Sequence, residues 1–465
     1  MTMTGSLFGL LNIAQSGMAA QSAGLDAAGE NISNVNTPGY AMVTANLETT
    51  DTADSFAGGV VVAGMSRSFD ALTFGSMLTQ QGLGGAADSR SEALGQVQSL
   101  VAPSSGTLGD DIDSFFSAYQ TLETSPGDAS ARAGVLQAAG ELADSVSATA
   151  NGLSSQRASL ATEAGSVVTT LNQNLAQIAA LNTQIAAARG SGDAPTDLED
   201  QRDQLASTVS TEIGAQVVTD DNGDYTLLAG GTALVANGTA ATVGVSLDSA
   251  NDLAFTSALG TGLPQDITTG VTAGTLGGIR EARDSDITTV ASQLDQLAFN
   301  LSTAVNGIQS AGYGLDGVTG RNLFTQPTTV AGAAAAMAID PRVAGDPSAI
   351  AASSTAAGVP GGNDSAIAMA QLASQPLGAS DTPADAYAAI GTTVGNLSAS
   401  ANDEQSLRQA TISQAQALNS SVSGVSLDQE MAHLDQFQRA YEASAQVLQT
   451  ADSMLGELMT DMQDG

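Results

Sequence analysis

The residues best suited to acid–base, nucleophilic or metal chemistry are few in this chain and are poorly spaced for it. His433 is the single histidine and there is no cysteine. A Ser/His/Asp triad or a His-bearing zinc site would therefore have to use His433. This residue stands beside Leu434 in a helical pattern and close to Glu430, so a histidine on a helix surface is the simplest interpretation. The lack of cysteine also excludes disulfides and thiolate catalysis.

Carboxylates are plentiful, but their spacing builds neither a calcium loop nor a catalytic pair. Asp220, Asn222 and Asp224 resemble the start of an EF-hand loop, which needs glycine at its sixth position and glutamate at its twelfth. Those positions hold Tyr225 and Gly231, so a β-hairpin is the better interpretation. No other carboxylate pair stands in an apolar context that would raise its pKa. We predict a protein that is not an enzyme, with no cofactor and no metal.

Two glycine-rich stretches raise the question of a phosphate-binding loop. They are Gly82-Leu83-Gly84-Gly85 and Gly274–Gly278. The chain contains no lysine, so a Walker motif is excluded. Neither stretch has the strand–turn–helix context of a dinucleotide-binding fold. We predict that both stretches form turns.

The charge balance argues against nucleic acid and anionic membranes as partners. The 12 basic residues are all arginine and face 48 acidic ones, which gives a formal net charge of −36. A nucleic-acid surface needs clustered cations, and these arginines are scattered along the sequence. No run approaches the ~20 apolar residues of a spanning helix. The N-terminus lacks the positive region of a cleaved secretory signal, so we expect no membrane insertion and an export route that removes no leader.

Both ends of the chain carry the 3.5-residue apolar repeat of a coiled-coil seam. The predicted interface residues near the N-terminus are Leu7, Leu11, Met18, Leu25, Ile32 and Val35. Those near the C-terminus are Leu427, Met431, Leu434, Tyr441, Leu448, Leu455 and Met459. Either stripe alone would fit an ordinary helix packed on a domain core. Because both lie at chain termini, each is the natural partner of the other, and we predict that they pair and assemble with neighbouring copies.

The first terminal helix is expected to be marginal in isolation. Gly9, Gly17, Gly24 and Gly29 each cost ~1 kcal/mol relative to alanine in a helix. Burial of one Leu or Met side chain in a seam returns ~1.5–3 kcal/mol. We therefore expect the ends to fold on pairing and assembly. The helix must stop before Pro38, since proline biases its predecessor away from the helical region.

Between the ends, the pattern predicts a mainly α, elongated, multidomain protein with an inserted β-rich module. Helical periodicity fills about 89–211 and returns from about 287, whereas Asn222-Gly223 is a strong hairpin signal. Residues 326–382 are rich in Ala, Gly, Ser and Pro and fit either loops with short helices or a partly mobile linker. The predicted domains are a terminal coiled coil (1–40 with 424–465), a helical middle domain (41–211 with 276–423, with a hairpin near 41–77) and a β-rich outer module (212–275).

The residues that close the first helix resemble a known signature. Ser6-Leu7-Phe8 and the run from Gly29 to Tyr40 are similar to the N-terminal signature of flagellar rod, hook and hook-associated proteins. In that family an Asn-Ile-x-Asn-x-Asn-Thr-Pro-Gly-Tyr run closes the terminal helix. The matching residues here are Asn31, Asn34, Asn36, Thr37, Pro38, Gly39 and Tyr40. The chain departs from the family pattern after Tyr40, where Ala41-Met42-Val43 replaces the common Ser-Arg-Gln.

Other stretches favour the hook-associated protein 1 family within this group. Residues 424–430 and Phe437–Ala445 resemble its C-terminal end, with Ser444 where hook and rod proteins usually carry Asn. Three internal stretches, within 125–142, 178–205 and 274–306, resemble its helical domain.

The resemblance implies a structural subunit that forms the junction between hook and filament outside the cell. It implies unfolded export through the flagellar type III channel, with a chaperone on the C-terminal helix. The partners would be other copies, the hook protein and the next hook-associated protein. The terminal helices would line an inner tube, and the middle domains would face outward. The alternatives are a hook or distal-rod protein, which the long helical stretch at 89–211 argues against, and a secreted coiled-coil adhesin or hydrolase.

Overall fold

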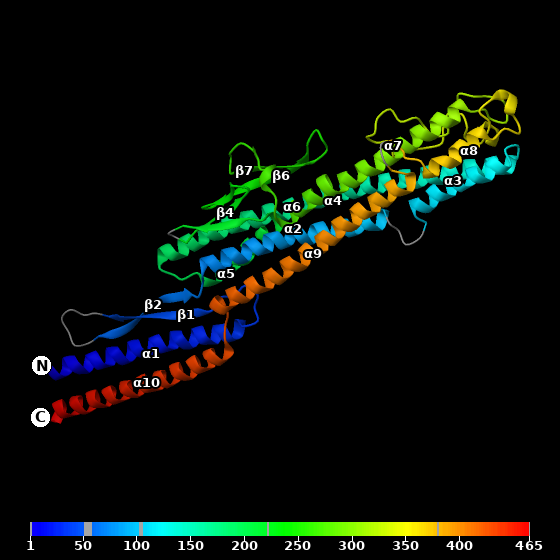
Figure 1. The fold of residues 1–465 in the computed structure, drawn as a ribbon. Coiled ribbons are helices and arrows are strands. Elements are labelled where there is room, and N and C mark those ends of the chain that lie inside the picture. Colours follow the sequence, from blue (N-terminus) through cyan, green and yellow to red (C-terminus); the bar gives the residue numbers. More distant parts are fainter. Residues whose placement is uncertain (1, 51–57, 102–105, 221–222, 379–380, 465) are drawn as a thin grey trace.

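The computed structural model is an elongated rod of helices with a β-sheet on one flank (Figure 1). Residues 2–50, 58–101, 106–220, 223–378 and 381–464 are described. The terminal helices α1 (Thr2–Asn34) and α10 (Leu427–Asp464) lie side by side at one end, with both chain termini together. The prediction of a mainly α, elongated fold with paired terminal helices and an inserted β module is confirmed.

A hairpin leads from the terminal helices into the rod. Strands β1 (Val43–Thr50) and β2 (Gly59–Arg67) pair antiparallel, and both pack against α1. Helix α2 (Ala71–Val101) follows at once. The hairpin is therefore shorter than the predicted 41–77, and the helical region begins well before residue 89. Glycines in the first half of α2 hide its helical pattern in the sequence.

The prediction that the two glycine-rich stretches form turns is wrong. Gly82, Gly84 and Gly85 lie within α2, and Gly274–Gly278 belong to α6 (Gly274–Arg280). A Cβ at Gly85 would overlap the carbonyl of Thr211, near the end of α5 (Thr196–Ile213), and one at Gly278 would overlap the carbonyl of Ala86. These glycines thus let three helices cross with their backbones in contact.

Long helices form the body of the rod. α4 (Ala129–Ser191) spans 63 residues, and α2 and α9 (Pro383–Ser423) run beside each other. The far end holds α3 (Leu108–Thr124), α8 (Asp364–Gln371) and part of α7 (Ile287–Ala311). In the described part of residues 326–382 there are short helices and loops whose Met337 and Ile350 are buried, so the first of the two alternatives for this stretch holds.

The β module is an antiparallel meander. Its strands, in sequence and spatial order, are β3 (Gln216–Thr219), β4 (Tyr225–Ala229), β5 (Thr232–Ala236), β6 (Thr239–Leu247), β7 (Leu253–Leu259) and β8 (Gln265–Asp266). The pairing of β3 with β4 confirms the hairpin predicted from Asn222-Gly223, although Asn222 lies outside the described residues. Asn237, with a φ of 52°, forms the two-residue turn between β5 and β6.

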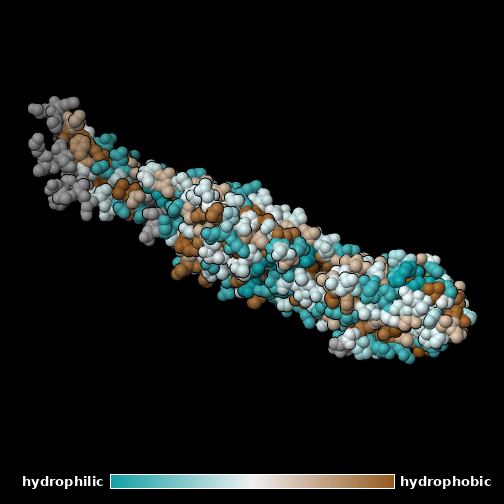
Figure 2. Space-filling view, turned by 90° about the horizontal axis from the view of Figure 1, so that it is seen from above, coloured by the Kyte–Doolittle hydropathy of each residue, from teal (hydrophilic) through white to brown (hydrophobic). Residues whose placement is uncertain are grey.

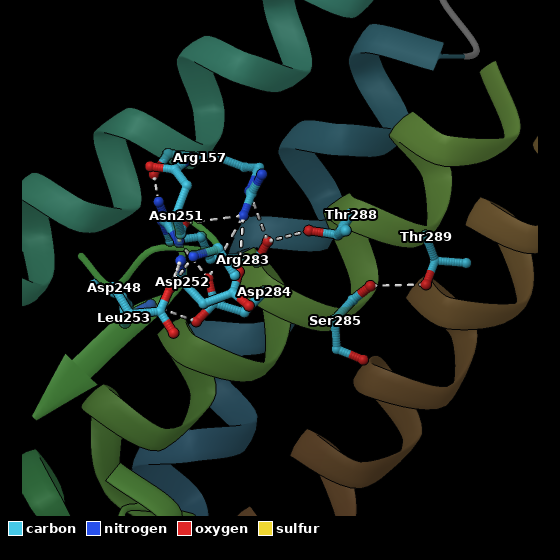
Figure 3. A network of polar contacts seen from close by, with 11 residues as sticks. Arg157, Asp248, Asn251, Asp252, Leu253, Arg283, Asp284, Ser285, Thr288 and Thr289 are labelled. Carbon is cyan, nitrogen blue, oxygen red and sulfur yellow. Dashed lines mark hydrogen bonds and ion pairs between the residues drawn. The ribbon is translucent and has the colours of Figure 1, made fainter. Parts of the chain in front are cut away.

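A buried arginine network fastens this module to the rod (Figure 3). Arg157 of α4 donates from Nε to the carbonyl of Arg283 (3.1 Å), and Arg283 donates from Nε to the carbonyl of Arg157 (3.0 Å). Both guanidinium groups also reach the carbonyl of Asn251, in the turn between β6 and β7. Arg283 lies in a π-helical turn, η2 (Glu281–Asp286), and its charge is paired with Asp284. The network therefore fixes the module's orientation on the rod.

Candidate assembly interface

Two glycines of α1 face helix α10, and both are small enough for a close approach. Ala14, Ala20 and Ala27 of α1 are also buried. A Cβ at Gly24 would lie 2.7 Å from the ring of Phe437, and one at Gly17 would lie 3.2 Å from the Ser444 hydroxyl. Two of the four glycines that weaken α1 as an isolated helix, Gly17 and Gly24, are thus positions where α10 side chains lie close to the α1 backbone.

Helix α10 turns one stripe toward α1. Its buried and half-buried positions recur at spacings of four and three, and include Glu430, Leu434, Phe437, Ser444, Leu448, Ala451 and Leu455. Three predicted interface residues, Leu434, Leu448 and Leu455, belong to this stripe. Phe437, which fills the space above Gly24, was not among the predicted residues. The available signal was its position three residues after the predicted Leu434, a spacing that puts both on one helix face.

The other predicted residues of α10 face solvent. Met431 is 66% exposed and Met459 is 60% exposed, and Leu427 and Tyr441 are exposed as well. On α1, Leu7 is buried, whereas Leu11, Met18, Leu25, Ile32 and Val35 are half-buried. The sequence prediction did not include further exposed apolar residues on these helices, namely Phe8, Leu10, Ile13, Val447 and Met454.

These exposed apolar residues are distributed along both terminal helices. We call them together the terminal apolar surface and define it as Phe8, Ile13, Leu427, Met431, Val447, Met454 and Met459. Figure 2 shows apolar side chains at the narrow end of the rod. α10 packs chiefly on α1. A lone pair of helices therefore leaves much of α10's apolar side uncovered.

Asn31, in the family-like motif, is the buried hub of the terminal unit. Its Oδ1 accepts hydrogen bonds from the Tyr40 hydroxyl (2.7 Å) and the Val43 amide (2.9 Å). Its Nδ2 donates to the Val43 carbonyl (2.9 Å) and to Oε2 of Glu430 (3.1 Å), which is 2% exposed. One side chain therefore joins α1, the chain after the motif, the start of β1, and α10.

The rest of the motif forms an exposed turn at the end of α1. The Thr37 amide donates to the Asn34 carbonyl (2.8 Å), and the Tyr40 amide donates to the Thr37 carbonyl (3.2 Å). Asn36 and Pro38 are exposed, and Gly39 has a φ of 82°, which favours glycine. Burial, together with nearby carboxylates, raises the pKa of the Tyr40 hydroxyl, so Tyr40 acts here as a neutral donor.

The motif leads directly into a joint with the middle of the rod. The Ala41 amide donates to Oδ2 of Asp200 (3.3 Å). Arg67 of β2 pairs with Oδ1 of Asp200 (3.1 Å) and with Asp203. Burial raises the pKa of Asp200 to about 6, although Arg67 opposes that shift. The two family-like stretches around residues 29–40 and 197–205 therefore meet in space.

The described residues offer little for catalysis or metal binding. They contain no group of three or more His, Cys, Asp or Glu side chains placed to hold a metal ion. The side chain of His433 is half exposed on α10, with Nδ1 3.8 Å from Oε1 of Glu430. Among the helices of the described residues, none is long and apolar enough to span a bilayer. The terminal helices instead carry exposed apolar side chains.

Comparison with known proteins gives matches along most of the chain. Residues 94–324 match the flagellar hook-associated protein FlgK helical domain. Residues 11–40 match the flagella basal body rod protein family, and residues 415–461 match the flagellar basal body rod FlgEFG protein C-terminal family.

Full-length relatives and a solved structure agree with these matches. Flagellar hook-associated protein 1 of Escherichia coli (strain K12) is 28% identical over 97% of this chain and 99% of its own. The protein of that name from Bacillus subtilis (strain 168) is 27% identical over 99% of both chains. The flagellar hook junction protein FlgK from Burkholderia pseudomallei superposes with a TM-score of 0.67 at 18% identity, covering 75% of this chain and 100% of that chain, which shows a shared fold.

The rod-protein matches at both ends, on two helices that pair, define an axial protein of the bacterial flagellum. Within that class, the helical-domain match and the near full-length relatives show that the chain belongs to the flagellar hook-associated protein 1 family.

Proposed function

We propose that this chain is a structural, non-catalytic subunit of the flagellum that forms the junction between hook and filament. Membership of the hook-associated protein 1 family supports this role. The observation that carries the mechanism is the terminal apolar surface, which remains exposed after α1 and α10 have paired. Neighbouring copies cover it when the subunit polymerises.

Physical chemistry favours burial of this surface in an assembly. Many large apolar side chains left exposed on a soluble protein are typical of an interaction surface. Burial of each large side chain returns ~1.5–3 kcal/mol. The chain's net charge of −36 makes subunits repel one another, so apolar contact has to supply the attraction. The half-buried residues of α1 and α10 hold the two helices of one subunit together. The exposed apolar side chains on the same helices join that subunit to its neighbours.

Membership of the hook-associated protein 1 family supports the proposed partners. The terminal helices line the inner tube, with hook protein below and the next hook-associated protein above. Before assembly, an export chaperone covers the apolar face of α10, which would otherwise associate prematurely. The subunit works outside the cell, after unfolded export through the flagellar type III channel. The marginal stability of α1 suits a segment that must unfold and refold.

The test is complementation of a strain in which the gene is deleted. We expect the deletion strain to lack filaments and to release free flagellin. A double variant, Met431→Asp with Met459→Asp, is expected to be exported normally and to leave cells without filaments. Gln446→Asp, at an exposed polar position of the same helix outside the predicted repeat, adds a charge without removing apolar surface and is expected to restore motility. Normal filaments in the deletion strain would refute the role, and normal filaments with the double variant would refute the mechanism.

A further inference from the structure

A pocket beside the joint gathers an unusual share of the chain's positive charge. It has a volume of about 510 Å³ and lies between β2, the α4–α5 connection, the start of α5 and the β3–β4 hairpin. Arg67, Arg189 and Arg202 all line it. They are three of only 12 cationic residues in the chain.

Arg202 is the member of this set whose charge is not balanced by direct contact. It is 3% exposed, and its guanidinium lies 3.5 Å above the ring of Tyr225. Its Nη1 donates to Oδ1 of Asn182 (3.1 Å) and to the Gly223 carbonyl (3.0 Å), which are neutral acceptors. Among the described residues, Arg202 forms no ion pair, and its buried Nε has no hydrogen-bond partner. Burial without a paired anion lowers the pKa of this guanidinium.

The other charges around the pocket are engaged with one another. Arg67 is held by Asp200 and Asp203, and Glu199 lies 2.6 Å from Arg189. Asp193 is exposed at the edge. Asp203 and Glu199 stabilise the Arg202 charge at longer range, but neither is in contact with it. A buried cation without a contacting anion is costly, and an anion that enters the pocket would offset that cost.

We propose that this pocket accepts a carboxylate side chain from a second copy of this chain. A guanidinium recognises a carboxylate through paired hydrogen bonds. Met65, Phe69 and Pro195 supply apolar walls for the methylene groups of a glutamate. The volume lies in the ~300–1,000 Å³ range of pockets that hold small ligands. The chain has 48 acidic residues, so a second copy is a source of carboxylates for the one guanidinium here that no anion contacts, Arg202. The choice of partner rests on the proposed function; the carboxylate chemistry does not.

The carboxylate chemistry is tested with glutarate as the probe and a matched pair of variants. Thr196 lines the pocket at the first residue of α5, where a Glu is compatible with the helix. Thr196→Glu adds a negative charge, and Thr196→Gln adds nearly the same volume without charge. At constant ionic strength, glutarate should raise the Tm of the full-length wild type and of Thr196→Gln. Thr196→Glu should bind glutarate at least about fivefold more weakly. Equal binding by both variants, or no glutarate-dependent shift in the wild type, overturns the inference.

The identity of the partner is tested in assembled flagella. The chain has no cysteine, so Thr196→Cys carries a single thiol for a benzophenone maleimide. Labelled chain is introduced into isolated hook–junction assemblies and irradiated. Covalent dimers of this chain are expected. If only labelled monomer is found, the pocket faces solvent and takes a small free carboxylate. If the crosslink joins another axial protein, that protein and not a second copy is the partner. Either result overturns the assigned partner. Assembly of the labelled chain would leave the proposed function standing in every case.

Discussion

Removal of the Asn31 side chain should loosen the terminal unit, in which it joins α1, β1 and α10. Asn31→Ala deletes four hydrogen bonds at once. The Tyr40 hydroxyl is half-buried and can turn to water. The amide and carbonyl of Val43 and the carboxylate of Glu430 are buried and lose the bonds that Asn31 gave them.

The size of the effect follows from those three buried groups. Each buried polar group left without a partner costs ~1–3 kcal/mol, and more if it is charged. Partial entry of water reduces the sum, so we expect a loss of about 3–5 kcal/mol in the free energy of opening the terminal unit. Because each 1.4 kcal/mol is a factor of ten, amide exchange should accelerate by roughly a hundredfold to a few thousandfold.

Hydrogen exchange measured by mass spectrometry on the full-length chain reads this out by segment. Exchange should accelerate in α10 and β1, and peptides from the centre of α4 serve as the internal reference. Asn34→Ala is the matched control, because its two side-chain hydrogen bonds, to the Glu30 carbonyl and from the Thr37 hydroxyl, lie near solvent. That control should change exchange by less than about tenfold. Equal acceleration by the two variants would refute the role of Asn31 as a buried hub.

Three further outcomes test the packing, the joint and the module's attachment. Gly85→Ala should lower Tm, since its Cβ would overlap the backbone of α5, whereas Gly95→Ala in the same helix meets nothing and should raise stability by ~0.5–1 kcal/mol. Asp200 binds its proton more tightly in the folded state, so its contribution to stability falls as the pH rises from about 4 to 6. Over that range the free energy of unfolding of the wild type, relative to that of Asp200→Asn, should fall by up to ~3 kcal/mol. Denaturant titration measures this difference. Arg283→Met should accelerate exchange in the turn between β6 and β7, and Arg342→Met, at an exposed pair, should not.

The sequence predicted the elements whose signals are local, and it failed where the cause is distant in the chain. Apolar periodicity was enough to predict the helices around Leu294 and Leu171 as core elements, and Asn222-Gly223 was enough to predict a hairpin. The glycines of α2 predict a turn from the sequence alone. Their structural reason is close contact between Gly85 and the backbone of Thr211, which is distant in the chain. Tertiary packing overrides helix propensity at such positions.

The same limit explains the candidate interface. The sequence repeat identified which helices pair, but it could not say which of its residues meet α1. The same repeat contains Leu434 and Leu448, which pack inward, and Met431, which is exposed. The choice is made by shape: Gly17 and Gly24 open a groove in α1 that accepts Ser444 and Phe437. Asn31, whose polar amide gave no apolar signal, then fixes the register by binding Glu430.

Register and exposure are coupled through this arrangement. With Phe437 seated over Gly24 and Glu430 bound to Asn31, α10 has no freedom to rotate its methionines inward without breaking a buried hydrogen bond. Met431 and Met459 therefore stay outside for as long as the pair is intact. The buried hydrogen bonds of Asn31 thus keep these apolar side chains exposed. If neighbouring copies cover them, as proposed above, the loss of Asn31 should impair assembly even where the terminal helices still pair.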